Sequence, residues 1–328
     1  MSAPENHAVV LAAHGGPEQL RWQSVPAVAP AAGEVVIRQT AVGLNYIDVY
    51  ARTGLYPLLK PPAVIGMEAA GIVTATGDGV TGLSAGDRVA YVAGPGGACC
   101  EQRVISARHL VRLPAGISDE QAAAIMLKGL TAEYLLFRTH PVKAGERVLV
   151  QAAAGGVGLL LCQWARALGC TVIGTAGGEE KCALALAHGA HHVIDYRHAD
   201  VATEVKRLTG NAGIDVVYDG VGRDTFQGSL DALATFGHLV SYGQSSGPVP
   251  PFTTAVLGAK SASVSRPSLF HYIADRARYE TMAARLFAAV ADGTLTVTIG
   301  RTFPLRDCAG AHRALENRET IGATVLLP

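Results

Sequence analysis

The stretch "VLVQAAAGGVG", residues 148–158, constrains the fold more than any other part of the chain. Its first three residues, Val148, Leu149 and Val150, form an apolar run that predicts a strand buried on both faces. The next stretch, "VGLLLCQWARALG", carries apolar residues at helical spacing and ends at Gly169, a residue typical of a helix C-terminal cap. The alanines and glycines therefore lie at a turn between a strand and a helix, where something approaches the backbone closely.

The second half of the chain alternates strands with helices. Such alternation implies a parallel sheet with helices on both faces, and six strands make a full doubly wound, dinucleotide-binding sheet. The predicted strands are 147–151, 171–175, 192–195, 215–219, 237–242 and 262–265, and the predicted helices lie near 157–168, 179–188, 200–208 and 224–235.

The first 125 or so residues read instead as short strands separated by turns. "GEVVIRQTAVGLN", "EAAGIVTATGDGV" and "GDRVAYVA" run between Gly, Asp and Pro residues, which indicates an antiparallel, barrel-like β domain. A final helix, "YETMAARLFAAVADG", precedes the β-rich pieces "LTVTIGRTFPL" and "GATVLLP", and we expect this tail to rejoin the first domain. The predicted domains are 1–127 with 271–328, and 128–270.

Composition excludes several classes of protein. The net charge is zero, so no basic surface for nucleic acid or an anionic membrane is expected. No apolar run approaches the ~20 residues of a membrane span. The start, "MSAPENHAVVLAAHGG", lacks the pattern of a secretory signal, and six cysteines in 328 residues do not make a disulfide framework. A reduced, cytoplasmic protein of enzyme size is the expectation.

Residues Ala153 to Gly158 fit the dinucleotide fingerprint, with alanine in place of its first glycine. In this pattern Gly155 lets a pyrophosphate approach the backbone, and Gly158 allows the helix to pack closely on the strand. The N-terminus of the helix offers unpaired N–H groups and its dipole to the phosphates. Tight packing alone also produces such glycines, but their place between a strand and a helix favours a dinucleotide site.

Several motifs in order along the chain resemble the zinc-free quinone oxidoreductase branch of the medium-chain dehydrogenase/reductase superfamily, which includes zeta-crystallin. They are "GLNYIDVYARTGLYP", "PAVIGMEAAGIV", "MLKGLTAEYLL", "AAAGGVGLLLCQWA", "VVYDGVGRDTF" and "SRPSL". The resemblance implies an α/β protein with a chaperonin-10-like (GroES-like) β-barrel catalytic domain and a Rossmann domain with a six-stranded parallel sheet. It also implies NADPH as the hydride donor, small quinones as acceptors and a homodimer.

The resemblance further assigns roles to individual residues. It implies that Asn45 and Asp48 lie near the nicotinamide and its ribose, that Arg266 lies near the substrate, and that Lys181 and Tyr196 contact the 2′-phosphate of NADPH. The other residues that it implies for the cofactor are Thr131, Gly155, Gly156, Val157, Gly158, Tyr242, Gln244 and Arg318.

The residues themselves support a preference for NADPH over NADH. Dinucleotide sheets that bind NAD usually carry Asp or Glu at the tip of the second strand. Here that strand, "CTVIGT", continues into Ala176, Gly177 and Gly178 with no acid, and Lys181 follows within one helical turn. A small, open corner would leave room for a 2′-phosphate. In the alternative, Lys181 is one more solvated helix residue beside Glu179 and Glu180.

The residues argue against zinc. Zinc-containing relatives place a cysteine and a histidine where this chain has Asn45 and Met67, whose amide and thioether are poor zinc ligands. The structural zinc lobe of such enzymes needs four closely spaced cysteines, and this region has only Cys99 and Cys100. The group His188, His191 and His192 is interrupted by a glycine and reads as a solvated turn. We expect no metal.

A quinone is already electron-poor, so hydride transfer to it mainly requires that the ring be held flat against the nicotinamide. Candidate positioning residues are Asn45, Tyr50 and Tyr56; core or interface packing is an equally good interpretation of each tyrosine. One alternative is reduction of the carbon–carbon double bond of enals or enones, where a proton donor such as Tyr56 would matter more. Another is a structural or RNA-binding protein, a role that some relatives have.

Overall fold

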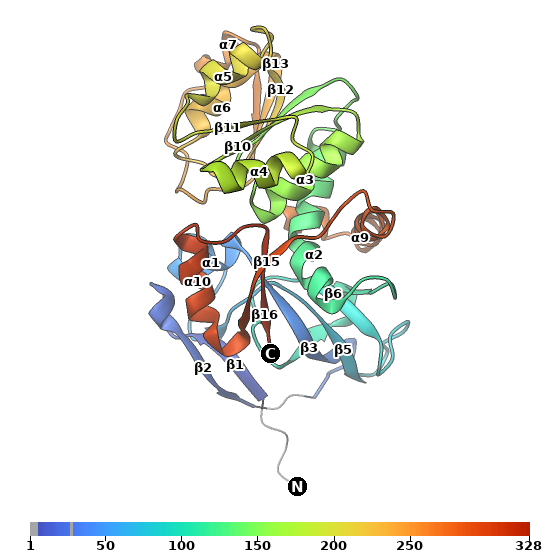
Figure 1. The fold of residues 1–328 in the computed structure, drawn as a ribbon. Helices are drawn as coiled ribbons and strands as arrows, with labels where there is room; N and C mark the ends of the chain where they lie inside the picture. Colours follow the sequence, from blue (N-terminus) through green and yellow to red (C-terminus); the bar gives the residue numbers. More distant parts are fainter. Residues whose placement is uncertain (1–5, 27–28) are drawn as a thin grey trace. The chain divides into compact units, whose positions relative to one another are not determined.

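The computed structural model describes residues 6–26 and 29–328, so the first five residues of the expected first domain lie outside the described residues. The chain divides into two compact units (Figure 1). In the described part of the chain, the first comprises residues 6–26, 29–127, 279–287 and 297–328, and the second comprises 128–278 and 288–296. The domain boundaries given by the sequence stay a prediction. Within the described residues, no helix has the length and apolarity needed to cross a membrane.

The second unit is built on one six-stranded sheet in which every neighbouring pair of strands is parallel. The predicted doubly wound sheet is therefore confirmed, including its short last strand. Chain order reverses at the first strand, as in dinucleotide-binding sheets. From one edge to the other the strands are β11 (His192–Asp195), β10 (Thr171–Ala176), β9 (Arg147–Val150), β12 (Ile214–Asp219), β13 (Leu233–Ser241) and β14 (Ser263–Ser265).

Helices cover this sheet in pairs, α3 (Gly156–Ala167) with α4 (Glu179–Ala187), and α5 (Val201–Leu208) with α6 (Phe226–Ala232) (Figure 1). The predicted helix near 224–235 extends too far, because α6 ends at Ala232. Leu233 is already the first residue of β13 and pairs with Ile214. The apolar strand residues form the core, with Leu149, Ile173 and Val217 all 1% exposed or less.

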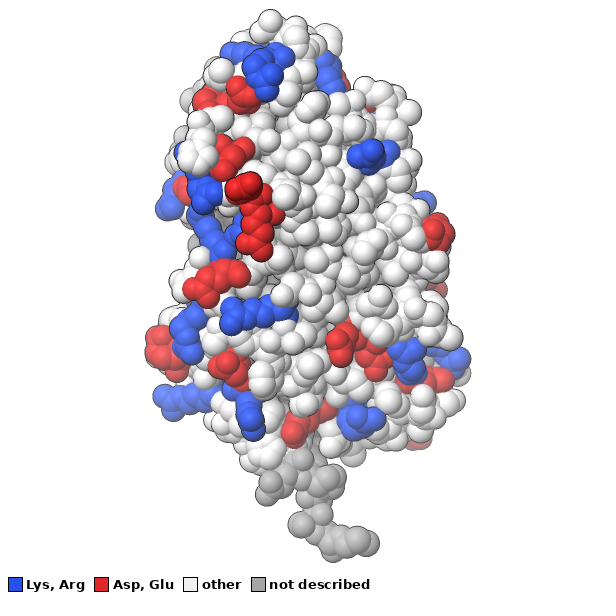
Figure 2. Space-filling model, in the orientation of Figure 1, with Lys and Arg blue, Asp and Glu red and all other residues white. Residues whose placement is uncertain are grey.

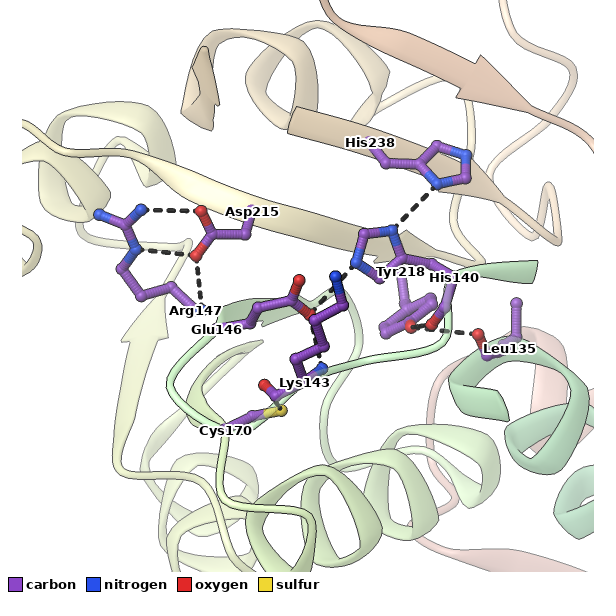
Figure 3. Close-up of polar contacts among 9 residues, drawn as sticks. All are labelled: Leu135, His140, Lys143, Glu146, Arg147, Cys170, Asp215, Tyr218 and His238. Carbon is purple, nitrogen blue, oxygen red and sulfur yellow. Dashed lines mark hydrogen bonds and ion pairs between the residues drawn. The ribbon is translucent and has the colours of Figure 1, made fainter. Parts of the chain in front are cut away.

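Polar contacts join the central strands to one another and to the chain that leads into β9 (Figure 3). Arg147, the first residue of β9, donates its backbone N–H and two guanidinium N–H groups to Asp215 on β12, at 2.7–3.0 Å. The hydroxyl of Tyr218 donates to the carbonyl oxygen of Leu135 at 3.1 Å, and the Nδ1 atoms of His140 and His238 lie 3.3 Å apart. These contacts hold the chain that leads into β9 against the sheet.

The first unit contains an antiparallel-rich sheet of seven strands and a smaller sheet of three. Its central strand β3 (Glu34–Leu44) pairs antiparallel with β5 (Glu68–Thr76), β7 (Gln102–Ser106) and β16 (Ala323–Leu327), so the last strand of the chain joins the sheet of the first unit. The other strands of the large sheet are β6 (Arg88–Val92), β8 (Leu110–Arg112) and β15 (Ile299–Pro304). The small sheet contains β1 (Asn6–Leu11), β2 (Leu20–Val25) and β4 (Ala63–Val64).

The remaining α-helices connect or cover these sheets. They are α1 (Tyr46–Thr53), α2 (Asp119–Tyr134), α7 (Ala255–Gly258), α8 (Leu269–Tyr272), α9 (Arg276–Ala291) and α10 (Cys308–Glu316). Basic and acidic side chains are intermixed on the face drawn in Figure 2, in keeping with the zero net charge of the sequence.

Candidate cofactor and substrate site

The glycine-rich turn joins β9 to α3, and its two fingerprint glycines meet different surroundings. A Cβ on Gly158 would lie 2.3 Å from the carbonyl oxygen of Ala152 and 2.8 Å from backbone atoms of Ala153. A Cβ on Gly155, the N-cap of α3, would meet a single atom, the Ala152 oxygen at 3.2 Å. Close packing therefore requires glycine at 158, whereas at 155 the backbone is open on its outer side.

The tight part of this turn falls one residue before the fingerprint. Ala152 has a φ of +54°, a left-handed conformation that non-glycine residues seldom adopt. A chain of buried hydrogen bonds supports it: Gln151 accepts from the Thr175 hydroxyl at 2.6 Å and donates to Ser229 at 3.0 Å, and Ser229 donates to Asp219 at 2.9 Å.

Sequence reasoning did not single out these supporting side chains, although Asp219 lies in the motif "VVYDGVGRDTF". Asp219 also accepts from the backbone N–H groups of Val221 and Gly222 at 2.8 and 3.0 Å. Because buried polar networks are rigid when every member is paired, this chain of bonds holds the carboxyl ends of β9, β10 and β12 in one arrangement.

The tip of β10 differs from the expectation of a small, open corner. A Cβ on Gly177 would lie 2.5 Å from the hydroxyl oxygen of Tyr196, and a Cβ on Gly178 would lie 1.9 Å from a guanidinium nitrogen of Arg197. The two glycines thus make room for these two side chains. Lys181, half-buried, follows in the first turn of α4, while Glu179 and Glu180 are exposed.

Four further candidates lie in the second unit. The Tyr242 hydroxyl lies over Gly220, since a Cβ there would come within 2.8 Å of it. Gln244 follows two residues later at the end of β13, and Arg266 follows β14 and donates to the carbonyl oxygen of Ser241 at 2.6 Å. These three residues are brought together at the carboxyl ends of neighbouring strands. Thr131, by contrast, is buried within α2.

In the first unit, Asn45 begins α1 and is held at both its backbone and its side chain. Its backbone N–H donates to the Asp48 carboxylate at 2.8 Å, one half of a capping box. Its side-chain Nδ2 donates to Glu68 Oε1 at 2.7 Å. Glu68 reaches this position because Gly43 lacks a side chain, as a Cβ there would lie 2.3 Å from the same oxygen.

Asp48 is 1% exposed, and burial raises the pKa of its carboxyl to about 7, while the nearby His312 acts to lower it. Among the described residues, its second oxygen, both ring nitrogens of His312 and two guanidinium nitrogens of Arg52 are buried without a hydrogen-bond partner. Arg52 does form an ion pair with Glu316 at 2.6 Å. Asp48 therefore supports the backbone of Asn45 from a buried, partly unsatisfied polar cluster.

The candidate tyrosines Tyr50, within α1, and Tyr56, just after it, lie together. The rings of Tyr50 and Tyr56 have centroids 4.9 Å apart, and Tyr46 lies 6.0 Å from Tyr50. Tyr50 is 7% exposed and packed among its neighbours, whereas Tyr56 is half-buried. Tyr50 is therefore buried as a packing residue is. Tyr56 is the more accessible of the two to a ligand. Arg318 lies just after α10, in the left-handed conformation at φ +61°.

The donor set at the two zinc-ligand positions does not fit zinc. Asn45 directs its amide nitrogen at Glu68, and Met67 is fully buried as a thioether. No cluster of three or more metal-ligating side chains occurs in the described part of the chain. His191 accepts the backbone N–H of Val172 at 3.0 Å and so helps to fix the start of β10.

Comparison with known proteins agrees with this architecture. Residues 31–143 match the family model of the alcohol dehydrogenase GroES-like domain, and residues 156–289 match that of the zinc-binding dehydrogenases. A quinone oxidoreductase of Pseudomonas aeruginosa is 47% identical, over 98% of this chain and 99% of the relative. A 2-haloacrylate reductase of a Burkholderia species is 43% identical, over 98% of each chain.

Solved structures give the same result. The crystal structure of an Escherichia coli quinone oxidoreductase complexed with NADPH has a TM-score of 0.96 and 44% identity, covering 98% of this chain and 100% of that one. Two family models, full-length relatives and a closely matching fold all agree. This chain belongs to the quinone oxidoreductase branch of the medium-chain dehydrogenase/reductase superfamily.

Proposed function

We propose that this protein is an NADPH-dependent quinone reductase that transfers a hydride to small quinones without zinc. The observation that carries the proposal is the turn between β9 and α3, where Gly155 leaves the backbone open in front of the N-terminus of α3. Full-length relatives that are named quinone oxidoreductases, and the NADPH complex of one of them, support it.

The residues at this turn fit a dinucleotide. The N–H groups in the first turn of α3 suit the pyrophosphate, and Tyr242 and Gln244 follow β13, two strands along the sheet from β9. We assign Gly155, Gly156, Val157 and Gly158 to this contact. The proposed cofactor set also includes Asn45, Asp48, Thr131, Lys181, Tyr196 and Arg318. When bound, NADPH supplies the hydride.

The proposed substrate residues are Asn45, Tyr50, Tyr56 and Arg266. Asn45 is held rigidly by Asp48 and Glu68, so its position is fixed before a ligand arrives. The half-buried ring of Tyr56 can stack on a flat quinone, and its hydroxyl can donate to a carbonyl oxygen. The ring of Tyr50 packs against that of Tyr56. A quinone needs orientation more than polarisation, which suits a site whose donors do not fit zinc.

The test is NADPH oxidation by purified protein with benzoquinone, naphthoquinone, an alkenal, 2-chloroacrylate and no acceptor. We expect the quinones to be reduced and the activity to survive exhaustive chelation. The 2-haloacrylate reductase among the relatives makes reduction of an activated double bond the competing outcome. Rapid reduction of the alkenal or the haloacrylate with quinones untouched would reject the proposal, as would one tightly bound zinc per chain that activity requires.

We further propose that the protein forms a homodimer through its second unit. The short strand β14 is the last in its sheet, and an unpaired edge favours pairing with a symmetry mate. Light scattering at micromolar concentration should give twice the mass of 33.9 kDa, and a monomeric mass would contradict the proposal.

We propose a cytoplasmic location as well. All six cysteines are free thiols, as is usual in a reducing compartment. Cell fractionation that recovers the protein outside the cytoplasm would overturn this assignment.

A further inference from the structure

Tyr196 and Arg197 lie at the tip of β10, although both belong to the chain that follows β11. The two strands are parallel neighbours, with Ala176 opposite Asp195, so their carboxyl ends come together. In dinucleotide-binding sheets the tip of the second strand is where the adenosine ribose carries its 2′ group. The side chains that cover Gly177 and Gly178 therefore occupy the position that distinguishes NADPH from NADH.

A carboxylate is present at this tip after all, supplied by the neighbouring strand. Asp195 Oδ2 accepts the backbone N–H of Gly178 at 3.1 Å, and Oδ1 accepts the backbone N–H of Arg197 at 3.0 Å. The backbone N–H of Arg197, followed by that of Gly178, holds the pKa of Asp195 below its usual range. Asp195 is thus ionised at neutral pH, and a bare carboxylate here would repel a 2′-phosphate and accept hydrogen bonds from a 2′-hydroxyl.

Arg197 opposes that charge. Its Nε and Nη2 atoms each lie 3.4 Å from an oxygen of Asp195, which is a loose contact, and its side chain is 52% exposed. Its guanidinium also lies against the Cα of Gly178, a position that any side chain on residue 178 would block. Gly178 itself has a φ of +97°, so a substituted residue would be strained there as well as crowded.

We propose that Arg197 is a specificity-determining residue, whose guanidinium binds the 2′-phosphate of NADPH and at the same time neutralises Asp195. In this arrangement Asp195 is a positioning residue: it holds the turn after β10 through Gly178 and orients Arg197 over it. A planar guanidinium with several donors suits a phosphate, and the long contacts to Asp195 leave donors free to turn toward one. The inference rests on the proposed use of NADPH.

The experiment is calorimetric titration with adenosine 2′,5′-bisphosphate and with adenosine 5′-monophosphate, which differ only in the 2′-phosphate. Arg197→Ala should weaken the bisphosphate about tenfold, the low end for a charge-assisted contact because the side chain is half exposed. Binding of the monophosphate should stay the same or tighten, because Asp195 is then free to accept from the 2′-hydroxyl. Arg197→Lys should retain part of the preference for the bisphosphate over the monophosphate. Higher salt should reduce the difference in bisphosphate affinity between wild type and Arg197→Ala.

The double variant Asp195→Asn/Arg197→Ala isolates the role of the carboxylate. Removing its charge should recover part of the affinity for the bisphosphate that Arg197→Ala loses, and the coupling between the two substitutions measures their interaction. Lys181→Ala serves as a comparison: it should weaken the bisphosphate by removing a second cation, without any tightening of the monophosphate. Arg207→Ala removes an exposed arginine paired with Glu204 on α5 and should change neither titration.

Each outcome has a separate meaning. An unchanged bisphosphate affinity in Arg197→Ala, or an equal loss for both nucleotides, overturns the role of Arg197 while the proposed function stands. A wild-type protein that does not favour the bisphosphate contradicts the use of NADPH itself. A clear Arg197-dependent preference in a protein that reduces no quinone supports this inference and rejects only the proposed acceptor.

Discussion

Alanine at position 158 is expected to destabilise the second unit by about 3 kcal/mol, the upper end of the usual cost of overpacking. The added methyl group would lie 2.3 Å from the Ala152 carbonyl oxygen and 2.8 Å from the backbone of Ala153. These are backbone atoms in a turn that the bonds of Gln151 and Thr175 hold in place, so they cannot move aside as the end of a long side chain can.

Alanine at position 155 is the matched control, because there we expect little change in stability but a loss of affinity for NADPH. Gly155 has a φ of −79°, which alanine adopts easily, and its Cβ would meet only the Ala152 oxygen at 3.2 Å. Alanine also restricts the unfolded chain more than glycine does. This stabilises the folded state by ~0.4–1 kcal/mol and offsets the mild crowding. The methyl group would nevertheless lie in the proposed path of the pyrophosphate, so the Kd for NADPH should rise roughly tenfold or more.

Both variants are best made in a Trp22→Phe background, so that Trp164 on α3 reports the unfolding of the second unit in denaturant. Calorimetry with NADPH gives the affinities. Equal losses of stability in the two variants would contradict the packing role of Gly158, and an unchanged NADPH affinity in Gly155→Ala would contradict the pyrophosphate contact.

Asparagine at position 48 is expected to stabilise the first unit above neutral pH by up to about 4 kcal/mol. The carboxyl of Asp48 has a pKa of about 7 in the folded protein, because burial opposes its ionisation. In the unfolded chain its pKa is ~3.9, and each unit of difference is worth ~1.4 kcal/mol. The folded state therefore binds this proton more tightly, and the free energy of unfolding falls as the pH rises from about 4 to about 7.

The Asp48→Asn variant does not ionise, and its side-chain oxygen can still accept the backbone N–H of Asn45. The two proteins should have similar stability near pH 4 and diverge as the pH rises to 8. Denaturation across this range in a Trp164→Phe background, with Trp22 as the reporter, measures the difference. Asp78→Asn, an exposed carboxyl in a turn of the same unit, should show no comparable pH dependence. If the free energy of unfolding fell equally with rising pH in the wild type and in Asp48→Asn, the prediction would be refuted.

The amino-acid sequence was sufficient for the architecture of the second unit. Its strands are apolar runs of β-branched residues and its helices are amphipathic, and both patterns are local properties of the chain. The glycine turn was predictable for the same reason, since a strand, a turn without side chains and a helix follow one another directly. Where the boundaries were wrong, as at the end of α6, a neighbouring strand decided: Leu233 joins the sheet because Ile214 lies beside it.

The candidate site was only partly predictable. The sequence identified Asn45 and Asp48, but not that Asn45 pairs with Glu68, nor that Gly43 makes space for that carboxylate. It showed no acid after β10, whereas the structure brings Asp195 to that point from β11. The Gln151, Thr175 and Ser229 bonds that support the glycine turn likewise join residues that are far apart in the chain.

The sequence by itself therefore determined the parallel sheet, the glycine turn and the class of ligand, because each depends on the order of neighbouring residues. Only the tertiary structure decided which charges meet that ligand and which stay buried. Parallel pairing places the ends of β10 and β11 side by side, so Arg197 comes to lie over Gly178 and Asp195 contacts its backbone. Burial of Asp48, a residue of α1, likewise raises its proton affinity, because desolvation depends on what surrounds a residue in space and not on its neighbours in the chain.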